Sequence, residues 1–237
     1  MTGKDRKNMR KKITFLLIAT MILTSFSAVF AADTADIDAT PISAGAAAPA
    51  DVKDTNYEDA VSTLMGKGII SGYMDGTFRP GTTINRAEAC VIVIKAMGPS
   101  ENNLSDAPKS SFKDLTGYDW AAKYIDFAAA KGVITGYADG TFRPAGKVTY
   151  AEMASMLIRA LGYKTDELTG VWPDNFISKA AAIGIFKGID YSANTAAIRG
   201  SVALMTNTVA DNILNGTKPE EPTEPGKGET GESGKDP

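Results

Sequence analysis

Gly72-Tyr73-Met74-Asp75-Gly76-Thr77-Phe78-Arg79-Pro80 returns 64 residues later as Gly136-Tyr137-Ala138-Asp139-Gly140-Thr141-Phe142-Arg143-Pro144. Such a period is typical of chains built from several copies of one small supersecondary unit. One unit cannot bury its apolar face alone, so neighbouring units must pack on one another. We therefore expect function to lie between copies as well as within one.

Three such units fit the central part of the chain, and we place them at residues 52–98, 112–162 and 172–214. Each begins with an apolar residue two positions before an aspartate, and these aspartates are Asp54, Asp114 and Asp174. The third unit is degenerate. Its Gly184-Ile185-Phe186-Lys187-Gly188 stretch echoes Gly132-Val133-Ile134-Thr135-Gly136, but the Asp-Gly-Thr-Phe-Arg-Pro loop is missing.

The flanking regions carry targeting and linker signals. A basic head followed by the apolar stretch from Ile13 to Phe30 predicts a signal peptide over residues 1–31. An uncleaved anchor would need about 20 apolar residues, and this stretch is interrupted by hydroxyl side chains. Residues 32–51 predict a flexible spacer, and residues 218–237 a disordered acidic tail rich in Pro, Glu and Gly. We expect export, with no membrane span left after cleavage.

Charge and composition exclude several classes of function. Removal of residues 1–31 changes the formal charge from −3 to −8, and no dense Lys/Arg cluster follows, which argues against a nucleic-acid partner. The chain has no histidine, so it cannot build a Ser-His-Asp triad, a Cys-His pair or a His-containing zinc site. Its single cysteine, Cys90, cannot form an internal disulfide, and an apolar helix face favours a core role over a reactive thiol.

The Asp-rich loop does not match a calcium-binding loop. Counted from Asp75, the twelfth position is Arg86, where glutamate is normal, and the sixth is Pro80, where glycine is normal. We therefore expect no metal, no cofactor and no catalytic residue in the chain.

Each unit is predicted to form a helix, a loop and a second helix. In the second unit an apolar stripe runs from Trp120 to Lys131 and ends at Gly132. Capping boxes are predicted at Asn85/Glu88 and Thr149/Glu152. Apolar stripes then continue in the second helices, through Ala89, Ile92, Val93, Ala96 and Met97, through Met153, Met156, Leu157, Ala160 and Leu161, and through Val202, Met205, Val209 and Ile213. The pattern predicts an all-α fold with these stripes in the core.

The loop between the two helices has its own signals. Asp-Gly pairs at Asp75 and Asp139 predict turns, because glycine adopts a positive φ at no steric cost. The arginines before proline, Arg79 and Arg143, are expected to be extended. The preceding phenylalanines, Phe78 and Phe142, are then expected to fill the gap between helices.

Together these motifs resemble the S-layer homology (SLH) repeat. The resemblance is carried by the apolar-x-Asp starts, Trp120, the Gly68 to Gly72 stretch, the Asp-Gly-Thr-Phe-Arg-Pro loop and Ile84-Asn85-Arg86-Ala87-Glu88. It implies three repeats packed as a pseudo-threefold, three-pronged spindle, in a protein secreted to the cell wall or S-layer surface of a bacterium. It also implies non-catalytic attachment to a secondary cell-wall polysaccharide, often bearing pyruvate ketals. Other cell-surface proteins are further candidate partners.

Two arginines are the first candidates for glycan binding. Arg86 lies in the first turn of a capped helix, where it can grip a ketal carboxylate with two parallel hydrogen bonds and the helix N-terminus also favours an anion. Arg199 holds the matching position in the third unit. The second unit departs from the pattern, because Tyr150 stands where the family expects Arg or Lys.

Four further positions are candidates with two readings each. Trp120 can present a flat face to a sugar ring or pack in the core. Gly72, Gly136 and Gly188 can let a glycan approach the backbone or can simply meet the needs of a turn.

Two rival functions remain at this stage. A glycosidase would need a carboxylate pair, and Glu88 and Glu152 are better explained as helix caps. A structural lattice protein would assemble through protein contacts without recognising a glycan. The identity of the sugar and of any cargo is not encoded in these patterns.

Overall fold

The computed structural model describes residues 48–221, and within them the chain is helical. The α-helices are α2 (Glu58–Gly66), α3 (Arg86–Ala96), α4 (Glu101–Ser105), α5 (Asp119–Ala130), α6 (Tyr150–Ala160), α7 (Asp174–Ala182) and α8 (Arg199–Asn215), with one short 3-10 helix at Thr165–Glu167. Extended pairing in this part of the chain is limited to three isolated bridges. The all-α prediction is confirmed. The predicted signal peptide, residues 32–47 of the spacer and residues 222–237 of the tail lie outside the described residues.

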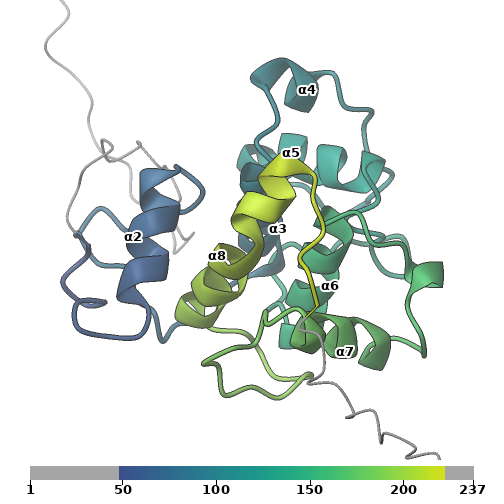
Figure 1. Cartoon of the computed structure of the whole chain (residues 1–237). Helices are drawn as coiled ribbons and strands as arrows, with labels where there is room; N and C mark the ends of the chain where they lie inside the picture. Colours follow the sequence, from purple (N-terminus) through teal and green to yellow (C-terminus); the bar gives the residue numbers. More distant parts are fainter. Residues whose placement is uncertain (1–47, 222–237) are drawn as a thin grey trace, which may run out of the picture. The chain divides into compact units, whose positions relative to one another are not determined.

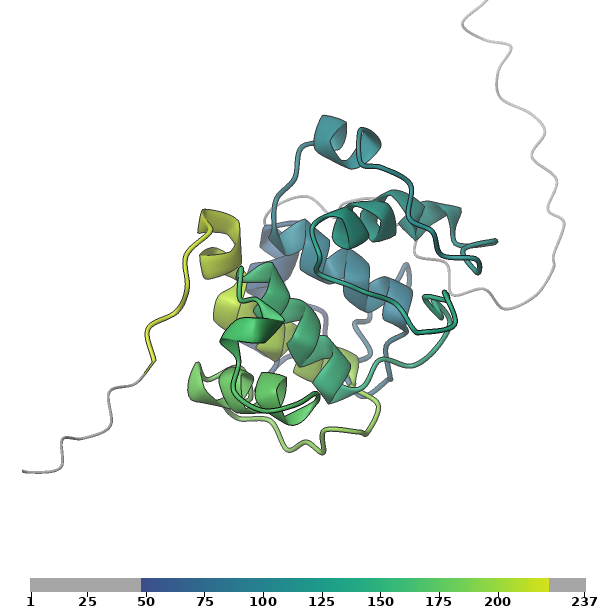
Figure 2. The same ribbon diagram turned by 90° about the vertical axis from the view of Figure 1, so that its right-hand side faces the viewer.

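The helices divide into an inner and an outer set (Figure 1). We use the names repeat 1, repeat 2 and repeat 3 for the units predicted at residues 52–98, 112–162 and 172–214. The inner helices α3, α6 and α8 are the second helices of these predicted repeats, and they pack on one another. Each outer helix packs on an inner helix of another repeat: α5 on α3, α7 on α6, and α2 on α8. Figure 2 shows α4 beside α5, and α7 beside α6, from a second direction. Each repeat therefore completes the packing of a neighbour.

A ring of backbone hydrogen bonds joins the three loops between outer and inner helices. We call these loop 1 (residues 67–85), loop 2 (131–149) and loop 3 (183–198). The Ile84 N–H donates to the Ala197 carbonyl (3.2 Å), Ala197 to Val148 (2.9 Å), and Val148 back to Ile84 (3.2 Å). The ring closes the three repeats into one cycle. The three-pronged spindle itself stays a prediction.

The start of each inner helix is held by the loop of another repeat. Two N–H groups at each start donate to loop carbonyls: Arg86 and Ala87 to Gly146 and Pro144, Tyr150 and Ala151 to Thr195 and Ala193, and Arg199 and Gly200 to Thr82 and Pro80. These are the groups that a helix leaves unpaired at its N-terminus. Both predicted capping boxes also form, at α3 and α6. The residue at each helix start is thus placed at a seam between repeats.

The core follows most of the predicted stripes, but Trp120 and Lys131, the two ends of the stripe in α5, are exposed. The stripe residues of α8 are all buried, and Phe78 and Phe142 are 2% and 0% exposed, as expected for side chains that fill the gap between helices. Cys90 is fully buried, and desolvation raises the pKa of its thiol to about 12. A thiol in that state is a small apolar core residue.

Two details of the loops differ from the sequence expectations. Arg79 and Arg143 are not extended; both have a positive φ, of 57° and 59°. Local bonds hold this conformation, because each guanidinium donates to an aspartate and a threonine of its own loop, as Arg79 does to Asp75 and Thr77. The extended prediction was wrong because pre-proline sterics are a weak preference that several hydrogen bonds override.

The start of repeat 1 also shifts. Asp114 accepts hydrogen bonds from the N–H groups of Phe142 and Arg143, and the residue that does the same for Phe78 and Arg79 is Asp51, not Asp54. The last residues assigned to the spacer therefore belong to the fold.

Candidate functional site

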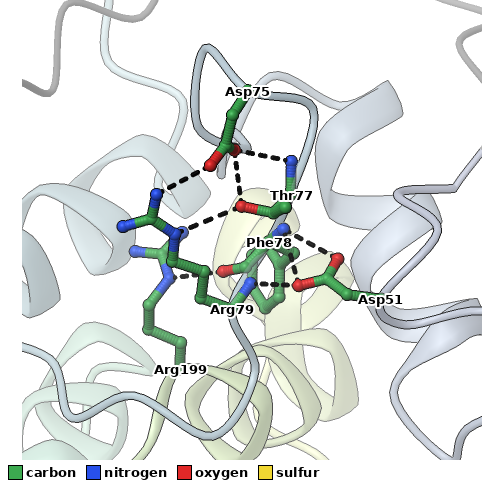
Figure 3. A network of polar contacts seen from close by, with 6 residues as sticks. All are labelled: Asp51, Asp75, Thr77, Phe78, Arg79 and Arg199. Carbon is green, nitrogen blue, oxygen red and sulfur yellow. Dashed lines mark hydrogen bonds and ion pairs between the residues drawn. The ribbon is translucent and has the colours of Figure 1, made fainter.

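Arg199 lies at the seam between repeats 3 and 1 and is held by backbone carbonyls (Figure 3). It is only 8% exposed. Its Nε donates to the Phe78 carbonyl (2.9 Å) and its Nη2 to the Ser71 carbonyl (3.1 Å). The guanidinium also stacks over the rings of Tyr73 (4.9 Å) and Phe78 (4.6 Å). Arg199 thus fastens the start of α8 to loop 1.

Arg86 occupies the matching place at the seam between repeats 1 and 2. It is also 8% exposed and stacks over Tyr137 and Phe142, each 5.1 Å from the guanidinium carbon. Its charged partner is different: Nη1 lies 3.2 Å from Oε1 of Glu152, on α6. The Tyr137 hydroxyl donates to the same oxygen (2.6 Å). Arg86 is therefore paired with a carboxylate rather than with the backbone.

The donors of Arg86 are incompletely used. Nε and Nη1 are buried, yet neither makes a hydrogen bond with good geometry; the contact to Glu152 is an ion pair only. Burial of unpaired polar groups costs free energy. A ligand that supplied acceptor atoms to these N–H groups would recover part of that cost.

A hollow of about 330 Å³ opens beside Arg86. We call it the Arg86 pocket. Its walls come from loop 2 (residues 133–138), from α6 and from the start of repeat 3, and they include Gly136, Tyr137, Glu152, Ser155, Met156, Arg159, Thr165, Trp172 and Phe176. It therefore lies between repeats and combines two cations, one carboxylate and several aromatic rings.

The third seam, between repeats 2 and 3, is neutral. Tyr150 stands at the position of the two arginines and donates its hydroxyl to Ser201 Oγ (3.1 Å). Its ring lies 5.9 Å from that of Tyr191, which stacks on Phe186 at 3.8 Å. Among the described residues this seam has the packing role of the other two without a guanidinium.

The three candidate glycines lie in equivalent loops but under different constraints. Gly136 lines the Arg86 pocket and has a φ of +68°, and a Cβ there would lie 2.2 Å from the Phe112 ring and 2.9 Å from the Thr141 carbonyl. Gly72 is not in the left-handed region, and a Cβ would meet only the Thr77 carbonyl closely, at 2.9 Å. Gly188 has a φ of +75° with open space around it. Its positive φ agrees with the turn role, and its glycan role stays a prediction.

The two tryptophans lie in different settings. Trp120 is 37% exposed and 6.2 Å from the Tyr118 ring, and it does not line the Arg86 pocket. Trp172 is 52% exposed, lines the pocket and donates its indole N–H to Ser155 Oγ (3.1 Å). Of the two tryptophans, Trp172 is therefore the one that contributes to the aromatic wall of this pocket, together with Tyr137 and Phe176.

Sequence reasoning did not single out Trp172, Tyr137 or Arg159 as site residues. A signal for Trp172 was present. Aligning Gly184 with Gly132 puts Trp172 in register with Trp120, whereas the repeat starts had aligned it with Phe112. Tyr137 and Arg159 had no comparable signal, because their place beside Arg86 depends on the exchange of helices between repeats.

Other features of residues 48–221 do not compete with this pocket. A larger hollow of about 510 Å³ lies by α4 and α5; its polar lining side chains are Asn103, Asp106 and Lys131, and no arginine lines it. No group of three or more metal-ligating side chains occurs in this part of the chain. Its helices are too short or too polar to cross a bilayer.

Comparison with known families agrees with the repeat structure. The S-layer homology domain matches residues 50–90 and 111–154. The chain contains S-layer homology domains. The matched residues cover repeats 1 and 2, including both Asp-Gly-Thr-Phe-Arg-Pro loops and Arg86.

Three relatives place this SLH protein among bacterial surface proteins. It is 32% identical to the middle cell wall protein of Brevibacillus brevis, 31% to the surface layer protein of Brevibacillus choshinensis and 34% to a cellulosome-anchoring protein of Acetivibrio thermocellus. The alignments cover 83%, 79% and 62% of this chain but only 18%, 16% and 36% of the relatives. Family and relatives indicate a secreted protein at the bacterial cell wall or S-layer surface.

Proposed function

We propose that this chain is a non-catalytic anchoring module that binds a secondary cell-wall polysaccharide at the seams between its repeats. One observation carries the proposal: a largely buried guanidinium lines a hollow that residues of all three predicted repeats enclose, and an exposed tryptophan lines the same hollow. An anchoring role agrees with the names of the relatives, one of which is a cellulosome-anchoring protein.

The pocket fits an anionic sugar. A pyruvate ketal presents one carboxylate fixed to a sugar ring, and the Arg86 guanidinium in the pocket wall is a cation suited to a charge-assisted hydrogen bond with it. Trp172 offers a flat face for the ring. Gly136, also in the pocket wall, leaves room for a glycan beside the backbone.

The other candidate residues form a second and a third seam in the same proposal. Arg199 and Gly72 lie at the seam between repeats 3 and 1, Trp120 lies on α5 of repeat 2, and Gly188 belongs to loop 3. The donors of Arg199 are spent on two carbonyls. We therefore propose that Arg199 contributes less to binding than Arg86.

A catalytic role is not part of the proposal. A glycosidase needs two carboxyl groups free to act on one bond. Glu88 and Glu152 each accept a hydrogen bond from the backbone N–H of their own N-cap residue. Glu152 is further engaged by Tyr137 and Arg86.

The proposal is tested by co-sedimentation of the exported protein with purified cell walls. Walls with intact polysaccharide are compared with walls from which the ketals have been removed by mild acid. Arg86→Gln should lower the bound fraction about tenfold, since a hydrogen bond to a charged group contributes about 1.5–3 kcal/mol. Lys147→Gln is the charge-matched control, because Lys147 is exposed in loop 2 and outside the pocket.

The outcomes separate the proposal from a lattice protein. Loss of binding after ketal removal supports recognition of the ketal carboxylate. Equal binding of Arg86→Gln and the unmodified protein contradicts the proposed site. Concentration-dependent assembly without polysaccharide, together with no wall binding, supports a lattice protein instead.

A further inference from the structure

A second arginine lines the Arg86 pocket. Arg159 lies near the end of α6, its guanidinium 4.6 Å from the Phe176 ring. No carboxylate of residues 48–221 forms an ion pair with it. Burial, and to a lesser degree the nearby charge of Arg86, lowers the pKa of Arg159. The two guanidinium groups line one hollow and repel each other electrostatically.

The carboxylate in the pocket cannot serve both arginines. Glu152 is fixed by three contacts: its Oε2 accepts from the Thr149 N–H (2.9 Å), and its Oε1 faces Tyr137 and Arg86. Turning it toward Arg159 would break the capping box of α6. The lining residues thus hold two positive charges and one negative charge, which leaves one positive charge to be neutralised.

Three residues of α6 line the pocket in order along the helix: Glu152, Ser155 and Arg159. Glu152 and Arg159 are seven residues apart, so they lie on one face about 10 Å apart along the axis. Ser155, which accepts the indole N–H of Trp172, lies between them. Side chains on a helix lean toward its N-terminus, so Arg159 leans back toward the Arg86–Glu152 pair, and Trp172, which is bonded to Ser155, lies beside the interval between them.

We propose that Arg159 is a second anion-binding residue of the Arg86 pocket, and that the pocket takes a sugar bearing one singly charged oxyanion, which both arginines contact while the ring rests on Trp172. The identity of the occupant as a wall glycan rests on the function proposed above. The oxyanion is a ketal carboxylate or a phosphodiester, since both carry one negative charge.

Calorimetric titration of the intact protein tests this proposal. The probes are three methyl glycosides of the same sugar: one neutral, one with a pyruvate ketal, and one with a methyl phosphodiester. The indole N–H resonance of Trp172, one of two tryptophans in the chain, reports occupancy of the pocket. Arg159→Gln should weaken binding of the preferred anionic probe by about tenfold to a hundredfold and leave the neutral probe unchanged.

Repeat 1 offers a matched control. Lys95 occupies in α3 the position of Arg159 in α6, and Lys95→Gln should not change either affinity. Comparison of the affinities for the ketal probe and the phosphodiester probe shows which oxyanion the pocket prefers. Equal affinity of Arg159→Gln and the unmodified protein for the anionic probes would overturn the proposal, as would equal affinity of the unmodified protein for charged and neutral probes or no binding of any probe.

The experiment also separates the two proposals. If Arg86→Gln loses wall binding and Arg159→Gln keeps it, the anchoring function holds and the role of Arg159 is wrong. If the protein binds no wall polysaccharide but Arg159→Gln still weakens the charged probe, the anchoring function is wrong and the second anion-binding residue stands.

Discussion

Arg199 and Arg86 start equivalent helices, are equally buried and stack on equivalent tyrosine and phenylalanine rings, yet their donors are used differently. Arg199 gives two hydrogen bonds to backbone carbonyls. Arg86 faces a carboxylate and keeps two buried nitrogens without a hydrogen bond. Position in a repeat thus sets where a cation lies, while its neighbours set whether that cation is free to bind.

The backbone of the facing loops gives a reason for the difference. Gly136 has a positive φ and Gly72 does not. The φ of a residue sets the orientation of the planar peptide group that precedes it, and for Gly72 and Gly136 that group carries the Ser71 and Thr135 carbonyls. Ser71 can accept from Arg199, whereas no hydrogen bond of the described residues joins Arg86 to Thr135.

The largest expected effect tests this backbone difference directly. Gly136→Ala should lower the free energy of unfolding by about 4 kcal/mol, because a Cβ would collide with Phe112 and the Thr141 carbonyl in a left-handed conformation. Gly72→Ala should cost about 2 kcal/mol, since only the Thr77 carbonyl is close. Urea denaturation of both variants measures the two values. Equal losses of unfolding free energy for the two variants would contradict the difference in backbone conformation between Gly72 and Gly136.

The arginines themselves give the next largest effect. Arg199→Met should destabilise the fold by about 3 kcal/mol, because it leaves the Phe78 and Ser71 carbonyls without their donor. Arg86→Met should cost about 1 kcal/mol, less than a fully buried broken pair, because Glu152 keeps its hydrogen bonds from the Thr149 N–H and the Tyr137 hydroxyl and is partly exposed. Urea denaturation again gives both numbers, with wall binding measured in parallel.

Stability and wall binding should rank the two variants in opposite order. Arg86→Met should lose more wall binding and less stability than Arg199→Met. A variant pair in which stability and binding fall together would show that both arginines are structural.

Arg199 lies at the seam where repeat 3 meets repeat 1. The neighbouring residue, Gly200, allows the packing at this seam to be tested by mutation. A Cβ on Gly200 would lie 2.8 Å from the Tyr57 ring, at the contact of α8 with α2. Gly200→Ala should therefore cost about 2 kcal/mol. Ala87 and Ala151 hold the equivalent positions of α3 and α6, so the backbone geometry itself tolerates alanine. A double-mutant cycle with Tyr57→Leu should show a coupling of about 1 kcal/mol, and its absence would contradict the contact.

Much of this fold was predictable from local sequence. The capping boxes at Asn85 and Thr149, the buried stripes and the inward phenylalanines depend on spacing within one repeat, where helix periodicity and cap chemistry act. The exchange of outer helices between repeats was not predictable in this way. It depends on which of several similar apolar faces meet, and that is decided by long-range packing.

The candidate site divides along the same line. Arg86 and Gly136 were identified from their places in the repeat, and both line the pocket. Arg159 and Tyr137 were missed because each becomes a candidate only through its position beside residues of another element, and that position cannot be predicted from local sequence. The different bonding of Arg199 and Arg86 was also missed, because it accompanies a difference in φ between Gly72 and Gly136 that two identical residue types do not reveal.

The smallest expected effect is a pH dependence that compares the two loops. Hydrogen bonds from Thr141, and then from Arg143, lower the pKa of Asp139 to about 2. The same contacts in loop 1, from Thr77 and then Arg79, lower the pKa of Asp75 still further. A carboxylate with a lowered pKa stabilises the fold above its unfolded pKa of about 3.9 and loses that contribution as pH falls through the folded value.

Asp139→Asn should therefore be less stable than the unmodified protein at neutral pH, and the difference should vanish as the pH falls from about 4 to about 2. For Asp75→Asn the difference should persist to lower pH, because the folded pKa of Asp75 is the lower of the two. Both carboxylates are exposed, so solvent screening keeps the effects small. Thermal unfolding of the two variants between pH 7 and the acid limit of the fold measures this order, and coincident pH profiles would show that the loops facing Arg199 and Arg86 have the same electrostatics.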